Sequence, residues 1–300
     1  MSSGYSSKLN SVFSKERTLR REFRRQKQRL TNIDRAAKMH ALRIAYDKEN
    51  KRTITVSLNE KEHKYFIGSS GWFYWHWRNI FYPQDLPMSA WFTYYASKFK
   101  TVELNAPFYS WPTLATIKAW QQQASHCDFI YTIKVCELIT HIKTFKNTKV
   151  LIRDFGLIAD LLGSRMGCFL FQLPPSFYFT IARLNLILTQ LDHNRRNVVE
   201  FRHPSWWNKE VYKAFQEHGT IFCSCSAPRL PNELIKTSDD IYIRFHGVKK
   251  WYDHDYRAKE LEEWTKKISD SNPKHVWAYF NNDRGGNAIR NALTFYAQQK

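Results

Sequence analysis

The sequence predicts an α/β fold in which eight parallel strands and the helices between them close into a (β/α)8 barrel. Eight short apolar segments recur between residues 65 and 282, and stretches with helical periodicity separate them. Most of these segments end on charged or amide residues, as parallel strands do when their bodies are buried and their C-terminal ends face a site. Residues 65–300 match the length of a single TIM-barrel-like domain, which is roughly 250 residues.

The expected strands and helices follow one another through this domain. Strands are expected at 65–71, 101–105, 129–135, 168–174, 197–203, 220–226, 241–247 and 276–282. Helices are expected at 89–99, 113–124, 155–164, 182–191, 205–219, 257–269 and 287–299. The connection 227–240 contains two prolines and predicts no regular helix. A doubly wound open sheet is the alternative fold, but no GxGxxG motif follows the first strand.

Residues 1–64 form a basic extension with seventeen Lys or Arg against seven Asp or Glu, a net charge of +10 out of +19 for the whole chain. Apolar residues recur at helical spacing in 15–46, at Leu19, Phe23, Leu30, Ile33, Ala37 and Ile44. This pattern predicts a basic amphipathic helix, broken near Thr31, in an extension that is otherwise partly helical or disordered. A short strand is expected at 54–58.

Three roles are compatible with this extension. It can be a helical arm packed on the barrel, or it can contact nucleic acid through residues 1–52, because clustered Lys and Arg bind phosphates. A membrane-surface, targeting or partner-binding role is the third. No apolar run approaches the roughly 20 residues that span a bilayer.

The five cysteines include no CxxC pair, and no apolar signal segment precedes the expected domain. We therefore expect a reducing, cytoplasmic location. Cys223 and Cys225 share one face of an expected strand, but no His or Cys lies at ligand spacing, so both are expected in the core. The sequence predicts no metal site, indicates no cofactor and leaves the oligomeric state open.

The polar residues at the strand ends are expected to share one site. Side chains two residues apart on a strand point the same way, so Glu103 pairs with Asn105 and Glu200 with Arg202. The complete inward-facing set is Glu103, Asn105, Lys134, Gln172, Glu200, Arg202, Arg244, His246, Tyr279 and Asn281. Its two carboxylates and three Lys or Arg leave one positive charge, which favours an anionic ligand. The alternative is a structural layer of ion pairs that holds the barrel together.

Two loops extend this candidate site. The segment NNDRGGNA (281–288) places glycines at the start of the last expected helix, where backbone N–H groups favour an anion. Aromatic residues crowd the first, fifth and seventh βα loops, where they can stack on a sugar or a base or form a hydrophobic cap over the barrel mouth. The expected substrate-binding residues outside the inward-facing set are His203, Asp283, Gly285, Gly286, Trp72 and Tyr74.

Seven motifs, in order, resemble the YecE-like family, also called domain of unknown function 72. They are GSSGWFYWHWRNIFYP (68–83), TVELNAPFY (101–109), ITH (139–141), FQLPPSF (171–177), VEFRHPSWW (199–207), YIRFHG (242–247) and YFNNDRGGNAIRNA (279–292). The resemblance covers about 65–298 and implies a TIM-barrel-type fold without supplying a reaction. The chain departs from the family pattern at Ala106, Pro107 and Ser226.

The leading functional hypothesis is an enzyme, a hydrolase or an isomerase, that acts on a phosphorylated sugar or a nucleotide-type substrate. Glu103 and Glu200 are the expected general acid and base, and His246 is a second proton carrier. The two carboxylates are also compatible with glycoside hydrolysis. Metal-assisted hydrolysis has less support because no HxH or HExxH spacing occurs. The alternatives are a nucleic-acid-binding protein and a non-catalytic scaffold.

Overall fold

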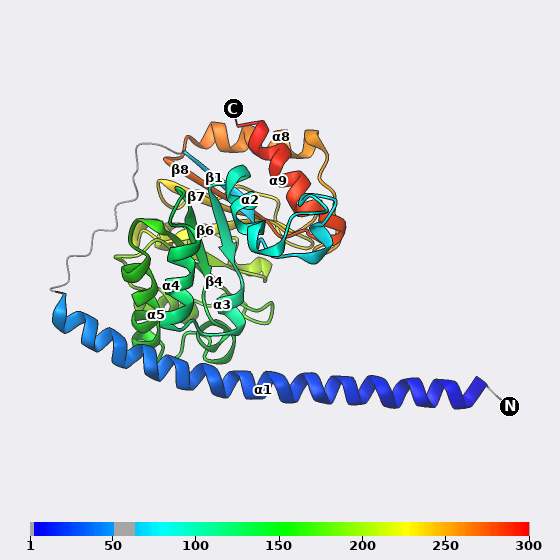
Figure 1. Cartoon of the computed structure of the whole chain (residues 1–300). Helices are drawn as coiled ribbons and strands as arrows, with labels where there is room; N and C mark the ends of the chain where they lie inside the picture. Colours follow the sequence, from blue (N-terminus) through cyan, green and yellow to red (C-terminus); the bar gives the residue numbers. More distant parts are fainter. Residues whose placement is uncertain (1–2, 51–63, 300) are drawn as a thin grey trace.

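The computed structural model describes residues 3–50 and 64–299. Eight parallel strands form one sheet in the order β1-β8-β7-β6-β5-β4-β3-β2 and curve into a nearly closed barrel (Figure 1). The strands are β1 Tyr65–Ser69, β2 Thr101–Leu104, β3 Ile130–Lys134, β4 Met166–Gln172, β5 Asn197–Glu200, β6 Ile221–Ser226, β7 Asp240–Phe245 and β8 His275–Phe280. The predicted barrel is therefore confirmed, and each strand lies within a few residues of its expected position.

Helices connect the strands and cover the outside of the barrel. The longer ones are α2 Trp91–Lys98, α4 Leu114–Gln123, α5 Lys149–Leu162, α6 Ile181–Gln190, α7 Lys209–Glu217, α8 Ala258–Ser271 and α9 Asn287–Ala297. The short ones are α3 Ala106–Tyr109, η1 Trp75–Trp77, η2 Met88–Ala90, η3 Leu138–Ile142, η4 Gly163–Arg165, η5 Pro204–Trp206 and η6 Arg284–Gly286. Thr113, Thr180 and Asn208 cap the starts of α4, α6 and α7 with their side chains. No helix lies between β6 and β7, as the two prolines predict.

A tyrosine hydroxyl joins the two ends of the sheet. β1 and β2 are the first and last strands of the hydrogen-bonded order. The Tyr95 hydroxyl accepts a hydrogen bond from the Ser69 backbone N–H at 3.0 Å and donates to the Thr101 carbonyl at 3.2 Å. A Cβ atom at Gly68 would collide with the same carbonyl oxygen, so the strands approach closely here. The Tyr95 hydroxyl thus takes the place of a direct backbone hydrogen bond in the wall of the barrel.

The barrel interior is divided into an apolar part and a polar end. Tyr242, Trp277 and Tyr279 belong to an interior cluster with Cys223 and Cys225, and all five are buried. The expectation that both cysteines lie in the core is confirmed. The charged residues gather beyond this cluster, at the C-terminal ends of the strands. Among the described residues, no helix is long and apolar enough to cross a membrane.

Helix α1, Ser3–Glu49, is a single long helix that crosses the loops after β2 and β3 and then runs beside α5 (Figure 1). The predicted break near Thr31 is wrong, because the Thr31 hydroxyl donates to the Lys27 carbonyl one turn earlier and the helix continues. Asn32 fixes the crossing by bonding the Tyr109 carbonyl. The strand expected at 54–58 lies outside the described residues.

Candidate functional site

Two buried glutamates share one buried arginine at the C-terminal end of the barrel. Arg244 on β7 donates through Nη2 to Glu103 Oε1 on β2 at 2.6 Å and through Nη1 to Glu200 Oε2 on β5 at 2.5 Å. All three side chains are fully buried. A buried charge requires a partner of opposite sign, and here one guanidinium bridges carboxylates from two strands that are not neighbours in the sheet.

Glu103 has three hydrogen-bond donors. Besides Arg244, the Ser70 hydroxyl donates to Oε1 at 2.7 Å and the Tyr242 hydroxyl donates to Oε2 at 2.5 Å. Tyr242 precedes Arg244 by two residues, so both point inward from the same strand. These donors are fixed by the barrel wall, so they orient the carboxylate and occupy both of its oxygens.

Glu200 is held ionised by a denser set of cations. Its Oε1 accepts from Arg202 Nε and lies 3.1 Å from His246 Nε2. Burial opposes the charge, but the Arg202 and Arg244 guanidinium groups, together with the hydrogen bond to His246, outweigh burial and hold the pKa of Glu200 well below its usual range. A carboxylate in this environment is a poor proton carrier at neutral pH.

His246 is neutral in this cluster. Burial and the neighbouring Arg202 guanidinium lower the pKa of its imidazole well below the ordinary value. His246 Nε2 lies 3.1 Å from Glu200 Oε1 and 3.2 Å from Arg202 Nη2, and Asn281 Nδ2 lies 3.3 Å from His246 Nδ1. His246 therefore bridges the Glu200–Arg202 pair and carries no charge of its own.

Lys134 differs from the other cations of the cluster because it has no carboxylate partner. No ion pair joins its ammonium to an acidic group within residues 16–50 and 64–299, and its Nζ lies 4.1 Å from the centre of the Phe108 ring. Burial is the largest effect on this amine, and Arg244 and Arg202 add to it against Glu200 and Glu103. Together they lower its pKa to about 7. Lys134 consequently exchanges its proton near neutral pH.

The loops after β2, β3 and β7 add residues that the sequence interpretation did not include. His141 of η3 and Phe108 of α3 lie with ring centres 4.9 Å apart. Burial and the nearby Lys134 lower the pKa of His141 to about 4, so its ring is neutral. Trp251 lies under the Arg202 guanidinium at 4.3 Å. His141 stands in the ITH motif and Phe108 in the motif TVELNAPFY, which were usable signals, whereas Trp251 lies in a loop without periodicity.

Three other expected residues border the cluster. Asn105 donates to the Ser70 carbonyl at 3.2 Å, and its buried Oδ1 has no hydrogen-bond partner in the described part of the chain. The Tyr74 hydroxyl donates to the same carbonyl at 2.7 Å. Burial, Asp283 and Glu103 raise the pKa of Tyr74, so it stays protonated. Gln172, also buried, donates to the Leu173 carbonyl at 2.7 Å.

Other expected residues have structural partners instead. Tyr279 bonds through its hydroxyl to Thr101 and Thr132 in the barrel interior, at 2.7 and 2.8 Å. His203 accepts from the Ser205 backbone N–H and so caps η5. Trp72 packs edge-on against Phe92 of α2. Their substrate-binding roles are untested predictions, and the observed contacts give no support for them.

The last loop is tied to the first. Asp283 accepts from Trp77 Nε1 and His76 Nε2, both at 2.8 Å. Gly285 and Gly286 both have positive φ, and they begin α9 as expected. An added Cβ at Gly286 would press on Ile80 of the first loop. These contacts hold the last loop against the first and give Asp283 and Gly286 a structural role. Anion binding at the start of α9 stays a prediction.

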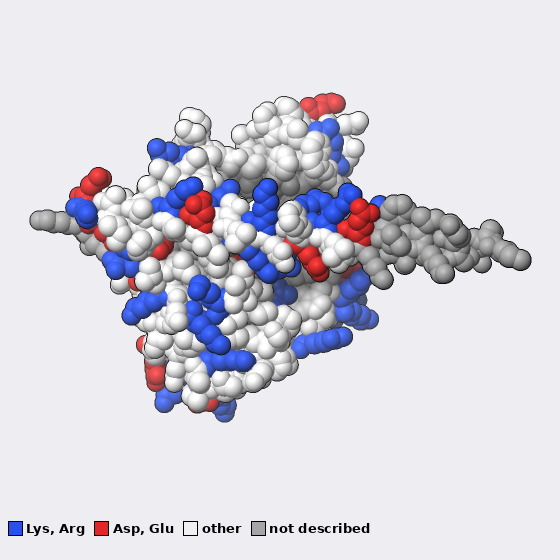
Figure 2. Space-filling view, turned by 90° about the horizontal axis from the view of Figure 1, so that it is seen from below, with Lys and Arg blue, Asp and Glu red and all other residues white. Residues whose placement is uncertain are grey.

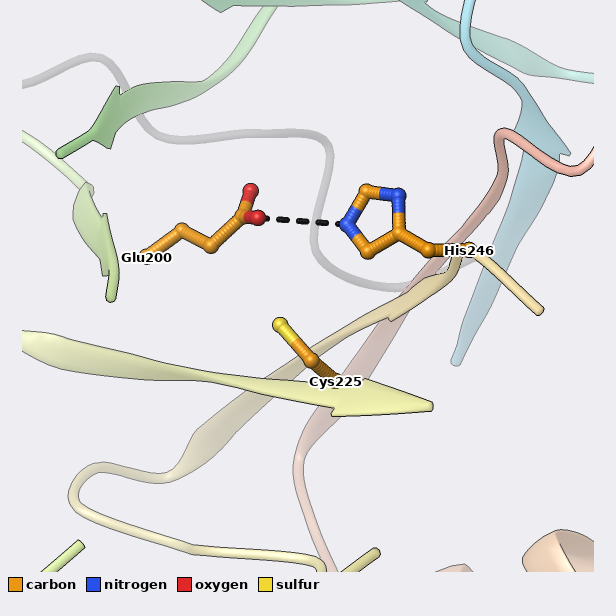
Figure 3. Close-up of side chains that lie close together, drawn as sticks. All are labelled: Glu200, Cys225 and His246. Carbon is orange, nitrogen blue, oxygen red and sulfur yellow. Dashed lines mark hydrogen bonds and ion pairs between the residues drawn. The ribbon is translucent and has the colours of Figure 1, made fainter. Parts of the chain in front are cut away.

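One trio of side chains brings three metal-ligand types together. Glu200, Cys225 and His246 are buried, with ligand atoms within 4.8 Å of one another, and Figure 3 shows the carboxylate facing the imidazole with the thiol beside them. However, two guanidinium groups already bind this carboxylate, and one of them, Arg202, also lies 3.2 Å from His246 Nε2. A divalent cation would face both positive charges at close range. These two guanidinium groups therefore disfavour a metal ion at this trio.

The fold and the inward-facing ionic cluster define a TIM-barrel-like protein with a polar site at the C-terminal ends of its strands. The chain belongs to the family described as "Protein of unknown function DUF72", whose model matches residues 66–300. The predicted family is thus confirmed, and helix α1 and the segment after it lie outside the match.

Solved and sequenced relatives agree with this assignment. UPF0759 protein YunF of Bacillus subtilis (strain 168) is 26% identical over 263 residues, covering 75% of this chain and 91% of YunF. The crystal structure of a DUF72 family protein (TM1631) from Thermotoga maritima MSB8 is 28% identical with a TM-score of 0.71, covering 79% of this chain and 99% of that one. A DUF72 family protein (EF0366) from Enterococcus faecalis V583 is 20% identical with a TM-score of 0.65, covering 79% and 98% of the two chains, and shows the same fold.

Proposed function

We propose that the barrel is an enzyme that transfers a proton on a small anionic substrate, of the phosphorylated sugar or nucleotide class, at the C-terminal end of the strands. The observation that carries this proposal is Lys134, a buried amine without a carboxylate partner whose pKa is lowered to about 7. A general base works best when its pKa lies near the working pH. Lys134 meets this condition, so we assign it the proton-transferring role.

The glutamates support the amine in this scheme. Glu200 is ionised and bonded to two guanidinium groups, and both oxygens of Glu103 already accept hydrogen bonds. Neither is well placed to take a proton, so catalysis by the paired carboxylates has less support than catalysis by Lys134. A hydrolase needs a group that activates water, whereas an isomerase needs a base beside a carbon acid. Lys134 supplies a base for either reaction, and we propose the isomerase, which deuterium exchange tests directly.

The substrate class follows from the charges around Lys134. The charges of Arg202 and Arg244 balance those of Glu103 and Glu200, and a protonated Lys134 adds one more positive charge. The Arg202 guanidinium carbon lies 4.3 Å from the centre of the Trp251 ring, and the Arg202 side chain is only 9% exposed. A planar guanidinium held in this way suits a phosphate or carboxylate of the substrate.

Deuterium exchange tests the chemistry even when the product has not been identified. Phosphorylated aldoses, phosphorylated ketoses and nucleoside monophosphates would be incubated with the protein in D2O and followed by NMR. We expect one class to exchange a carbon-bound hydrogen, with the rate falling at least 100-fold in Lys134→Met and unchanged in Lys146→Met, a matched change at an exposed lysine. Exchange that persists in Lys134→Met, or a panel in which no compound exchanges or raises the melting temperature, would refute the proposal.

A second candidate function is binding of nucleic acid by α1, favoured by how charge is divided along the helix. Residues 16–30 hold seven Lys or Arg against two Glu, whereas 31–49, which lie along the barrel, hold four against three. Figure 2, in which the molecule is seen from below, shows Lys and Arg side chains along the described part of α1. All of 16–27 is exposed. Such a stripe supports phosphate contact.

Fluorescence anisotropy with labelled DNA and RNA at several salt concentrations would test this candidate. The triple variant Arg17→Glu, Arg21→Glu and Arg24→Glu should lose binding and flatten the dependence on salt. The control changes Lys209, Lys213 and Lys259 to Glu, an equal charge change on exposed parts of α7 and α8. Equal loss in both triple variants would point to net charge alone and contradict a binding site on α1.

The proposed cytoplasmic location has one supporting observation. All five cysteines are free thiols, and Cys223 Sγ and Cys225 Sγ stay 3.9 Å apart without bonding. Free, mostly buried thiols are typical of proteins in reducing compartments.

A further inference from the structure

Helix α1 carries an apolar stripe that the barrel does not cover. Leu19, Phe23, Leu30 and Ile33 are 64%, 70%, 69% and 54% exposed. Ala37 and Ile44 continue the stripe, and the spacing fits alternating steps of three and four residues with polar residues only at Gln26 and His40. This narrow repeat is the seam of a coiled coil.

The stripe lies on a different face from the one that docks on the barrel. The residues of α1 that are buried against the barrel are Asn32, Ala36, Met39 and Arg43. At 100° per residue, that face is centred roughly 130° around the helix axis from the stripe. A second helix can therefore lie along the stripe without displacing the barrel.

We propose that a second copy of this chain covers the stripe, through an antiparallel coiled coil of the two α1 helices. Antiparallel pairing sets Phe23 against the partner's Ile33, and Leu19 against the partner's Ala37. Beside Ile33 and Ala37, the barrel leaves an apolar groove of about 460 Å³, lined also by Leu138, Val150 and Leu151. Phe23 thus meets the partner's Ile33 beside the groove, and Leu19 meets the small side chain of the partner's Ala37. The two-fold axis repeats both contacts on the other side of the pair.

Some of the charges that flank the seam are complementary in this arrangement. Glu22 and the partner's Arg29, and likewise Lys27 and the partner's Asp34, flank the layers formed by Phe23 and Gln26 as acid–base pairs, whereas Lys27 and Arg29 each also lie near their own counterpart across the two-fold axis. Arg17, Arg21 and Arg24 lie on the far side of the helix from the seam. These three of the seven cations of 16–30 therefore point away from the partner helix.

Sedimentation equilibrium of the full chain at 1–100 μM would test the pairing. We expect a mass of twice 35.9 kDa, and a shift to the single-chain mass in the double variant Phe23→Asp and Leu30→Asp. The matched control, Arg21→Asp and Arg24→Asp, places two aspartates on the opposite face and should remain dimeric. Circular dichroism would verify that α1 is still helical in both variants.

Disulfide trapping fixes the orientation. The variant with both Leu19→Cys and Ala37→Cys should cross-link two chains on mild oxidation, whereas Leu19→Cys alone should not. Cross-linking by Leu19→Cys alone would show a parallel pair and overturn the antiparallel register. A wild-type chain that is monomeric at 100 μM would overturn the proposal outright. So would a monomer that binds anionic phosphatidylserine vesicles through Phe23, because the occupant would then be a membrane surface.

Discussion

Replacing Lys134 by Met should stabilise the protein, by an amount that depends on pH. The pKa of this amine is about 7 in the fold against an ordinary value of 10.5. Each pH unit between these values is worth about 1.36 kcal/mol, so burying the ammonium costs roughly 4–5 kcal/mol below pH 7. Met keeps a similar length and the contact with Phe108 but carries no charge.

The sign of the pH dependence follows from proton binding. Between pH 7 and 10.5 the unfolded chain holds a proton on Lys134 that the folded chain has released, so wild-type stability rises with pH in this window. The advantage of the Met variant should therefore be fully present below pH 7 and shrink as pH rises, to roughly 2 kcal/mol at pH 9.

Urea unfolding at pH 6, 7.5 and 9, with the variants Lys134→Met and Lys146→Met, would measure this difference. Lys146 is exposed, so its variant should stay within about 0.5 kcal/mol of wild type at every pH. Acetic anhydride labelling, read by mass spectrometry, should independently give half-maximal reactivity of Lys134 near pH 7. If the stability gain of Lys134→Met does not change with pH, or if this variant is less stable than wild type, the reasoning is refuted.

Three further predictions address the framework around this amine. Glu200→Gln should cost roughly 3–5 kcal/mol of unfolding free energy, because two buried guanidinium groups lose their shared carboxylate; a cost under about 1 kcal/mol in urea unfolding would contradict the assigned ion pairs. Tyr95→Phe should cost about 1–3 kcal/mol of unfolding free energy and speed amide exchange at Ser69, since the Ser69 N–H and the Thr101 carbonyl lose their shared partner. Unchanged exchange would show that β1 and β2 are held together without the Tyr95 hydroxyl. Glu137→Gln should speed amide exchange in residues 16–30 of α1, because Glu137 is the acceptor for two arginines of that helix at 3.0 and 3.2 Å; equal exchange in variant and wild type would show that these ion pairs do not hold α1.

The sequence predicted the barrel well because its strands carry a simple signal. Each expected strand lies within a few residues of the observed one, since apolar bodies with polar ends are what parallel strands require. The phase of the alternation also held, so Glu103, Glu200 and Arg244 meet as expected. In contrast, the break predicted near Thr31 does not occur, because a threonine hydroxyl can bond within the helix instead of ending it.

The chemistry of the site was harder to predict from the same residues. Residue type identified Glu200 as an acid–base candidate, but its pKa depends on burial and on Arg244 and His246, which are distant in sequence, as well as on the nearby Arg202. The loop contacts of His141 and Phe108 have no periodic pattern to reveal them. Facing directions can be read from strand alternation, whereas pairing partners and burial depend on the assembled barrel.

The ionic cluster is better explained as support for Lys134 than as a purely structural layer. A structural layer requires that every buried charge be paired, and Glu103, Glu200 and Arg244 meet that requirement. Lys134 does not, and its burial costs the fold free energy. Beyond burial, the guanidinium groups of Arg244 and Arg202 lower its pKa, and the two glutamates fix those groups in place. Loss of Glu200 should consequently alter both the stability of the barrel and the pKa of Lys134, and labelling of Lys134 in Glu200→Gln would separate the two effects.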